Sequence, residues 1–184
     1  MNLSTRSIVV AGILIAITLL LSVANIGYIP VPNVTGAATI LQVPTIIGGV
    51  LEGPLVGGLI GLVFGVTSYF APGVQALFAD RSILVPIVVL LVPRILVGVV
   101  AWFVYSALRK QNEILALGAS AVVGTLTNTV GVVGLGVLFR VLPAAVIPTV
   151  IPQAIAEVVI SAVLVIAVVA AYKGIARGRA GSTV

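Results

Sequence analysis

The chain has 184 residues, of which 61% are hydrophobic and only 7% are charged, and the net charge is +5. A soluble domain usually carries about 25% charged residues, so a chain this apolar cannot cover a water-facing surface and requires lipid as its solvent. The absence of cysteine and histidine excludes disulfides, thiolate nucleophiles, imidazole bases and the usual zinc, haem and iron–sulfur ligands, and the lack of a basic cluster interleaved with aromatic residues excludes nucleic acid as a partner.

Six apolar segments are predicted to cross the membrane as helices, because a span needs about 20 apolar residues. The first is long enough to be retained as a helix rather than cleaved as a signal peptide. A Glu52-Gly53-Pro54 turn separates the second segment from the third, since glycine ends helices and proline starts them. The predicted spans are 8–26, 39–51, 55–70, 83–108, 114–139 and 147–172.

These spans predict an all-α integral membrane protein in which six transmembrane helices form one bundle. We expect a single domain over residues 1–184, with short cytoplasmic tails at 1–7 and 174–184. Both termini then lie on one side, and only Arg81 and Arg140 lie at the opposite ends of the spans. The basic residues on the side of the termini are Arg6, Arg109, Lys110, Lys173, Arg177 and Arg179. Because cytoplasmic segments are enriched in Lys and Arg, the termini are predicted to be cytoplasmic.

The third span is rich in glycine. Gly57, Gly61 and Gly65 recur every four residues, which places them on one helical face. Small residues let helix backbones approach closely in lipid. The pattern therefore predicts close helix packing and indicates nothing about a solute.

Several polar residues lie at membrane depth, where ionisable groups are expensive and usually face the bundle interior or a cavity. At 1.5 Å per helical residue, Arg94, Asn128 and Glu157 lie about 22, 21 and 24 Å above the cytoplasmic ends of their helices. The hydrocarbon core is about 30 Å thick, so the three share one level in its outer half. Gln153 is one turn from Glu157 on the same face, and Gln42 lies about 15 Å up.

Two interpretations of the charges are compatible with each other. Arg94 and Glu157 either form an internal ion pair that fixes the packing, or they line a polar pocket that opens to the outside. Pro93 also removes a backbone donor in the fourth span, so a carbonyl is freed near the same level.

Four stretches of the chain carry a family resemblance: ILQVPTIIGGVLEGPLVGGLIGLVFGVTSYF (40–70), VPRILVG (92–98), TNTVG (127–131) and QAIAEVV (153–159). They resemble the substrate-specific S components of energy-coupling factor (ECF) vitamin transporters. Six spans and a long first outer loop agree with that family, and the pattern is closest to its pantothenate-like group. The resemblance implies a multi-pass subunit of a prokaryotic cell membrane that binds a solute and has no ATPase activity of its own.

The resemblance also implies partners. The chain would capture a vitamin from outside and dock on a transmembrane coupling subunit that carries two ATPase subunits. Docking would use small residues of the first helix, here Ala11, Gly12 and Ala16. The first outer loop, residues 27–38, would cover the pocket and bring Asn33 to the solute.

Pantothenate is the favoured solute on chemical grounds, with no cofactor and no metal expected. Its carboxylate would suit Arg94, and its hydroxyls and amide would suit Asn128 and Gln42. An amine-bearing ligand would use Glu157 instead. The sequence leaves open which vitamin binds, and whether Arg94 and Glu157 touch it or only each other.

Two other classes of function fit the sequence less well. A self-sufficient carrier often shows internal repeats, and the two halves of this chain show none. An intramembrane enzyme lacks its usual residues: Asp80 is the only aspartate, and Glu157 has no nucleophile or metal set beside it. We therefore expect a binding subunit rather than an enzyme.

Overall fold

The computed structural model describes residues 4–30 and 37–180 and contains a helix in each of the six predicted segments. The helix in the fourth segment is continuous from Leu84 to Leu108 but changes its winding along its length. The elements in chain order are α1 (Thr5–Val23), β1 (Tyr28–Pro30), β2 (Ala37–Thr39), α2 (Gln42–Glu52), α3 (Pro54–Tyr69), α4 (Val74–Leu77), α5 (Leu84–Pro86), the π-helix η1 (Ile87–Leu91), α6 (Val92–Leu108), α7 (Glu113–Leu138) and α8 (Val146–Ala180).

Length and composition separate these helices into two groups. Four segments are long and apolar enough to cross a membrane: Thr5–Val23, Leu84–Leu108, Glu113–Leu138 and Val146–Gly174. Helix α3 is apolar but shorter, and α2 has only 11 residues. The helical, apolar chain agrees with the predicted class, and spans at α2 and α3 stay predictions. Helix α8 continues to Ala180, into the range that the sequence assigned to a tail.

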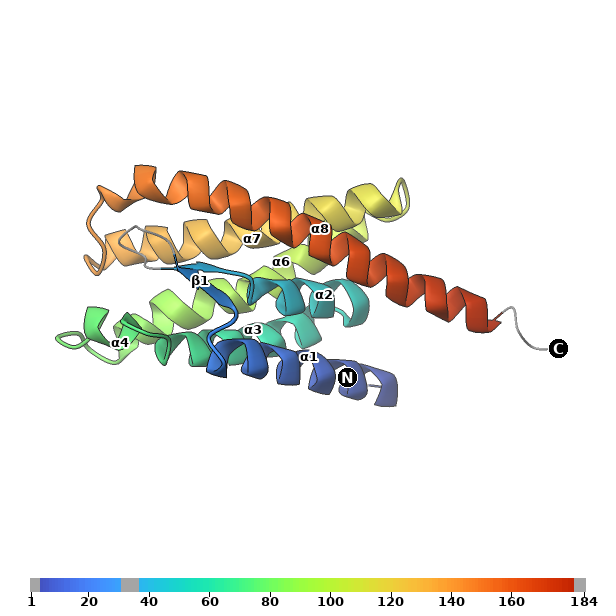
Figure 1. Cartoon of the computed structure of the whole chain (residues 1–184), viewed down its shortest axis with the longest axis horizontal. Helices are drawn as coiled ribbons and strands as arrows, with labels where there is room; N and C mark the ends of the chain where they lie inside the picture. The colour runs from blue at the N-terminus through green and yellow to red at the C-terminus, as the bar shows by residue number, and fades with distance from the viewer. Residues whose placement is uncertain (1–3, 31–36, 181–184) are drawn as a thin grey trace.

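The helices lie roughly along one axis (Figure 1). The start of α1 and the end of α8 lie at one end of the bundle, where the Arg6 guanidinium is 5.7 Å from the ring centroid of Tyr172. Helix α4 and the β1–β2 hairpin lie at the other end. The hairpin pairs Tyr28 with Thr39 in antiparallel register. The end with the termini carries Arg6 and Lys173 and is called the basic end below, whereas the other end carries the hairpin and α4.

Local sequence signals fix the helix boundaries. Gly53 has φ +100°, a left-handed conformation that a side chain disfavours, and Pro54 is the first residue of α3. The Ser4 hydroxyl accepts the Ser7 backbone N–H at the start of α1, and the Asn112 side chain accepts the Leu115 N–H at the start of α7.

Helices α3 and α6 pack through glycine. A Cβ atom added to Gly61 would lie 2.1 Å from the Arg94 carbonyl oxygen, and one added to Gly98 would lie 2.4 Å from the Gly57 carbonyl carbon. A Cβ on Gly65 would lie 3.0 Å from the Leu91 Cα. Because no side chain fits at these contacts, the glycine face brings the two backbones together, as the four-residue repeat predicted.

Polar contacts join the helices at the basic end. Arg6 Nε lies 3.2 Å from Glu52 Oε1, and the Ser7 hydroxyl donates to Glu52 Oε2 at 2.7 Å, so α1 is tied to α2. Lys173 of α8 donates to Glu113 of α7 and to the Tyr105 hydroxyl of α6. The contacts of Arg6 and Ser7 with Glu52 hold the rotation of α1 about its own axis, which decides which of its faces is exposed.

Candidate functional site

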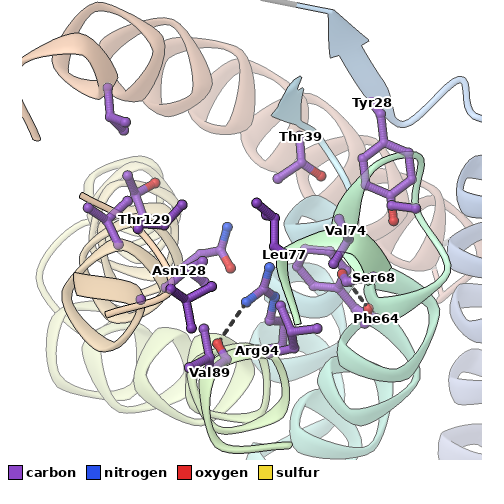
Figure 2. A pocket seen from close by; sticks show the side chains of 18 of the residues that line it. Tyr28, Thr39, Phe64, Ser68, Val74, Leu77, Val89, Arg94, Asn128 and Thr129 are labelled. Carbon is purple, nitrogen blue, oxygen red and sulfur yellow. Dashed lines mark hydrogen bonds between the residues drawn. The ribbon is translucent and has the colours of Figure 1, made fainter. Parts of the chain in front are cut away.

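A cavity of about 360 Å³ lies among α3, α6, α7 and α8 at the end that carries the hairpin. Arg94, Asn128 and Glu157, which the sequence placed at one level, all line it. Figure 2 shows Arg94 and Asn128 turned toward one another from neighbouring helices, with Thr39 of the hairpin across from them. The other polar side chains of the lining belong to Asn25, Tyr28, Ser68, Thr129 and Gln153.

Arg94 is held by the helix from which it projects. Pro93 has no N–H, so it cannot make the usual helical hydrogen bond to the Val89 carbonyl four residues earlier. The Arg94 guanidinium donates to that carbonyl through Nη1 at 3.1 Å, and its Cζ lies 5.4 Å from the Phe64 ring centroid. The freed carbonyl that the sequence predicted thus accepts a hydrogen bond from the neighbouring side chain. Arg94 Nε has no hydrogen-bond partner among the described residues.

Asn128 presents an acceptor to the same space. The residue is 4% exposed, and its Oδ1 has no hydrogen-bond partner in the described part of the chain. Buried polar atoms in native proteins are nearly all hydrogen-bonded, so an unpartnered one marks a place where a ligand or water binds. The cavity therefore offers a guanidinium with an unused N–H beside an amide oxygen that requires a donor.

The Glu157 carboxylate is occupied by donors from three elements. Its Oε1 accepts the Thr39 backbone N–H of β2 at 2.8 Å and Gln153 Nε2 of α8 at 3.0 Å. Its Oε2 accepts the Thr129 hydroxyl of α7 at 3.2 Å. The residue is 3% exposed, and these bonds stabilise its charge. Glu157 therefore joins the hairpin to two helices.

The ion pair between Arg94 and Glu157 that one interpretation required is not formed. The described residues include the ion pairs Arg6 with Glu52 and Lys173 with Glu113, and none is found between Arg94 and Glu157. The reason is local: Arg94 bonds the Val89 carbonyl, and the Glu157 oxygens are taken by uncharged donors. The two charges face one cavity without touching.

The remaining predicted solute contacts have different locations. Gln153 lines the cavity and donates to Glu157. Gln42 does not line it: the residue is fully buried, and its Nε2 donates to the Ser161 hydroxyl at 3.4 Å between α2 and α8. Its assignment to the solute site stays a prediction, because Gln42 projects between α2 and α8 rather than into this cavity. Asn33 lies outside the described residues.

The small residues of α1 do not share one face. Gly12 and Ala16 are exposed, and a Cβ on Gly12 would meet nothing within 4 Å. Ala11 is 8% exposed and packs in the hydrophobic core. Of the three predicted docking residues, Gly12 and Ala16 are therefore exposed and Ala11 is buried, and the docking role stays a prediction.

Part of the apolar lining of the cavity was not predicted from the sequence. It comes from two connections between predicted spans: the segment around α4 and the turn between α7 and α8. Arg81 Nη2 donates to the Arg140 carbonyl at 2.8 Å and links the two connections. Large apolar side chains inside loops were the signal available in the sequence. The residues are Val74, Leu77, Phe78, Val141 and Leu142.

Comparison with known proteins gives two findings. The family model described as ECF transporter, substrate-specific component, matches residues 6–169. The curated pantothenic acid transporter PanT of Lactococcus lactis subsp. cremoris (strain MG1363) is 32% identical over 105 residues, which cover 50% of this chain and 52% of that protein. The chain thus matches about half the length of this relative.

Proposed function

Because the chain belongs to the family of substrate-specific components of ECF transporters, we propose that it captures a vitamin that carries a carboxylate, with pantothenate as the favoured solute. The family assignment points to transport rather than catalysis. In this proposal the solute binds in the cavity beside Arg94 and is delivered by docking on a transmembrane coupling subunit with two ATPase subunits.

The observation that carries the proposal is the pairing of Arg94 with Asn128. A buried guanidinium is costly in a membrane unless an anion or polar groups satisfy it, and Arg94 retains an unused Nε beside the unpartnered Asn128 Oδ1. A solute with a carboxylate and a nearby hydroxyl or amide N–H satisfies both atoms. Arg is also the side chain best suited to a carboxylate, because its N–H groups match the two oxygens.

Pantothenate fits this chemistry. Its carboxylate would accept from Arg94, and a hydroxyl or its amide N–H would donate to Asn128. The cavity of about 360 Å³ falls within the range of about 300–1,000 Å³ that small-molecule sites occupy. The name of the Lactococcus relative supports the same solute. The carboxylate of Glu157 is already satisfied, which disfavours a cationic ligand there.

The topology and the docking surface complete the proposal. Six spans with both termini in the cytoplasm of a prokaryote would place the cavity toward the outside. The exposed pair Gly12 and Ala16 would face the coupling subunit, since small residues allow close helix approach in lipid. The hairpin would act as the cover of the cavity, because Tyr28 and Thr39 line it.

A binding measurement on the detergent-purified chain tests the function. Labelled pantothenate should bind saturably, and Arg94→Ala should weaken binding at least about tenfold, the cost of losing one charge-assisted hydrogen bond. Lys110→Ala, at an exposed position at the other end of the bundle, is the matched charge control and should bind normally. Absence of saturable pantothenate binding, or a different vitamin found with the purified chain by native mass spectrometry, would refute pantothenate as the solute.

A further inference from the structure

The segment that carries Arg94 departs from regular helix geometry. The π-helix Ile87–Leu91 lies directly before α6, and Pro93 is the second residue of α6. Single-turn π segments inside α-helices are rare and are frequent at functional sites. Here the proline also prevents a regular helical bond to the Val89 carbonyl.

Arg94 takes the place of the missing donor. Its Nη1 donates to the Val89 carbonyl at 3.1 Å, and the guanidinium lies against the Phe64 ring (Figure 2). An arginine side chain otherwise has many rotamers, and restricting them on binding opposes affinity. The bond to its own helix therefore orders Arg94 before any solute arrives.

Two glycines from other helices pack closely against Pro93 and Arg94. A Cβ on Gly61 of α3 would lie 2.1 Å from the Arg94 carbonyl oxygen. A Cβ on Gly131 of α7 would lie 2.7 Å from the Pro93 Cβ. Real Cβ atoms essentially never come closer than 3.0 Å to such atoms. Any side chain at either glycine would therefore displace Pro93 and Arg94.

We infer that Pro93 and Gly131 are positioning residues for solute selection. Pro93 leaves the Val89 carbonyl free to accept from the Arg94 guanidinium, and Gly131 leaves room for the proline ring. Together they orient Arg94 toward an acidic group of the solute. The inference rests on the proposed function for the identity of the solute. The backbone around Arg94 then contributes to the preference for an acidic solute, together with the arginine side chain. The cavity should consequently lose its preference for acids in variants that still contain Arg94.

The test compares pantothenate with pantothenol, in which a hydroxymethyl group replaces the carboxylate. Each variant has a matched control on the same stretch of helix. Pro93→Ala restores an N–H that can bond the Val89 carbonyl, whereas Pro86→Ala restores one directed at Ser82, four residues earlier, and leaves Val89 unaffected. In Gly131→Ala the added Cβ would clash with Pro93. A Cβ on Gly134 would meet nothing within 4 Å, so Gly134→Ala is the control.

The unaltered protein and both controls should bind pantothenate more tightly than pantothenol. In Pro93→Ala and in Gly131→Ala the affinity for pantothenate should fall at least about tenfold, while that for pantothenol changes less than about threefold. A parallel fall for both compounds, which general destabilisation would give, overturns the inference, and so does unchanged selectivity. If Pro93→Ala does not fold, Gly131→Ala decides.

A second measurement needs no solute. Phenylglyoxal, an arginine reagent, should modify Arg94 faster in Pro93→Ala than in Pro86→Ala, as followed by mass spectrometry, because the bond to Val89 no longer holds the guanidinium. Equal rates overturn the inference. If the unaltered protein bound neither pantothenate nor pantothenol, the proposed function would fail while this measurement still decided the positioning.

Discussion

Replacing Glu157 should separate hydrogen bonding from charge in the closure of the cavity. Glu157→Ala removes the acceptor of the Thr39 backbone N–H and so detaches strand β2 from α8. Glu157→Gln keeps an oxygen in the same place, which can still accept that N–H. Thr129 loses less in either variant, because its hydroxyl can donate instead to the Thr125 carbonyl, 3.3 Å away.

The expected loss of stability depends on which buried polar groups each variant leaves without a hydrogen-bond partner. A buried N–H left without an acceptor costs about 1–3 kcal/mol. Each bond to the charged carboxylate is worth about 1.5–3 kcal/mol, but its removal also relieves the desolvation of a buried charge, which is several kcal/mol. These two terms largely offset each other, so Glu157→Ala should destabilise the closed form by about 1–3 kcal/mol. Glu157→Gln should cost less than about 1 kcal/mol, because Thr39 remains paired.

The dissociation rate of labelled pantothenate measures this difference. We expect release from Glu157→Ala to accelerate about tenfold for each 1.4 kcal/mol lost, with near-normal release from Glu157→Gln. Ser161→Ala, one turn further along α8 and outside the cavity, is the control. Release from Glu157→Gln as fast as from Glu157→Ala would refute the reasoning. Recovery in the double variant with Arg94→Ala would also refute it, since it would reveal an ion pair.

Three further predictions concern topology, docking and packing. In this cysteine-free chain, a cysteine at Gln111 should resist an impermeant thiol reagent in intact cells and one at Asp80 should react, and the reverse result would invert the proposed orientation. Replacing Gly12 and Ala16 together by leucine should abolish uptake and leave pantothenate binding nearly unchanged, and a joint loss would exclude the docking role. Gly57→Ala should lower the free energy of unfolding by about 1–3 kcal/mol, because its Cβ would lie 2.9 Å from the α6 backbone; an unchanged melting temperature would contradict this.

The helical framework was predictable from local signals. Apolar runs long enough to span a membrane placed the helices within a few residues of their observed bounds, except that α8 continues to Ala180, and Gly53-Pro54 marked the break between α2 and α3. The depth of Arg94, Asn128 and Glu157 followed from the fixed helical rise. The repeat of glycines predicted a close contact, although it did not identify α6 as the partner.

The direction in which side chains point was decided by tertiary structure. In a membrane helix both the lipid-facing and the buried face are apolar, so the sequence pattern does not fix the rotation of the helix about its axis. Gln42 was therefore assigned to the cavity although it faces Ser161, and Ala11 was assigned to docking although it lies in the core.

The absence of an Arg94–Glu157 pair likewise depends on contacts far apart in the chain. Glu157 is satisfied by Thr39, 118 residues earlier, and by Thr129, 28 residues earlier. From the sequence alone the two charges were predicted to share one level along their helices, because the rise per residue is a local property. Only the packing of the hairpin and helices decided that each charge has partners of its own, because those partners come together through long-range contacts that no local pattern records.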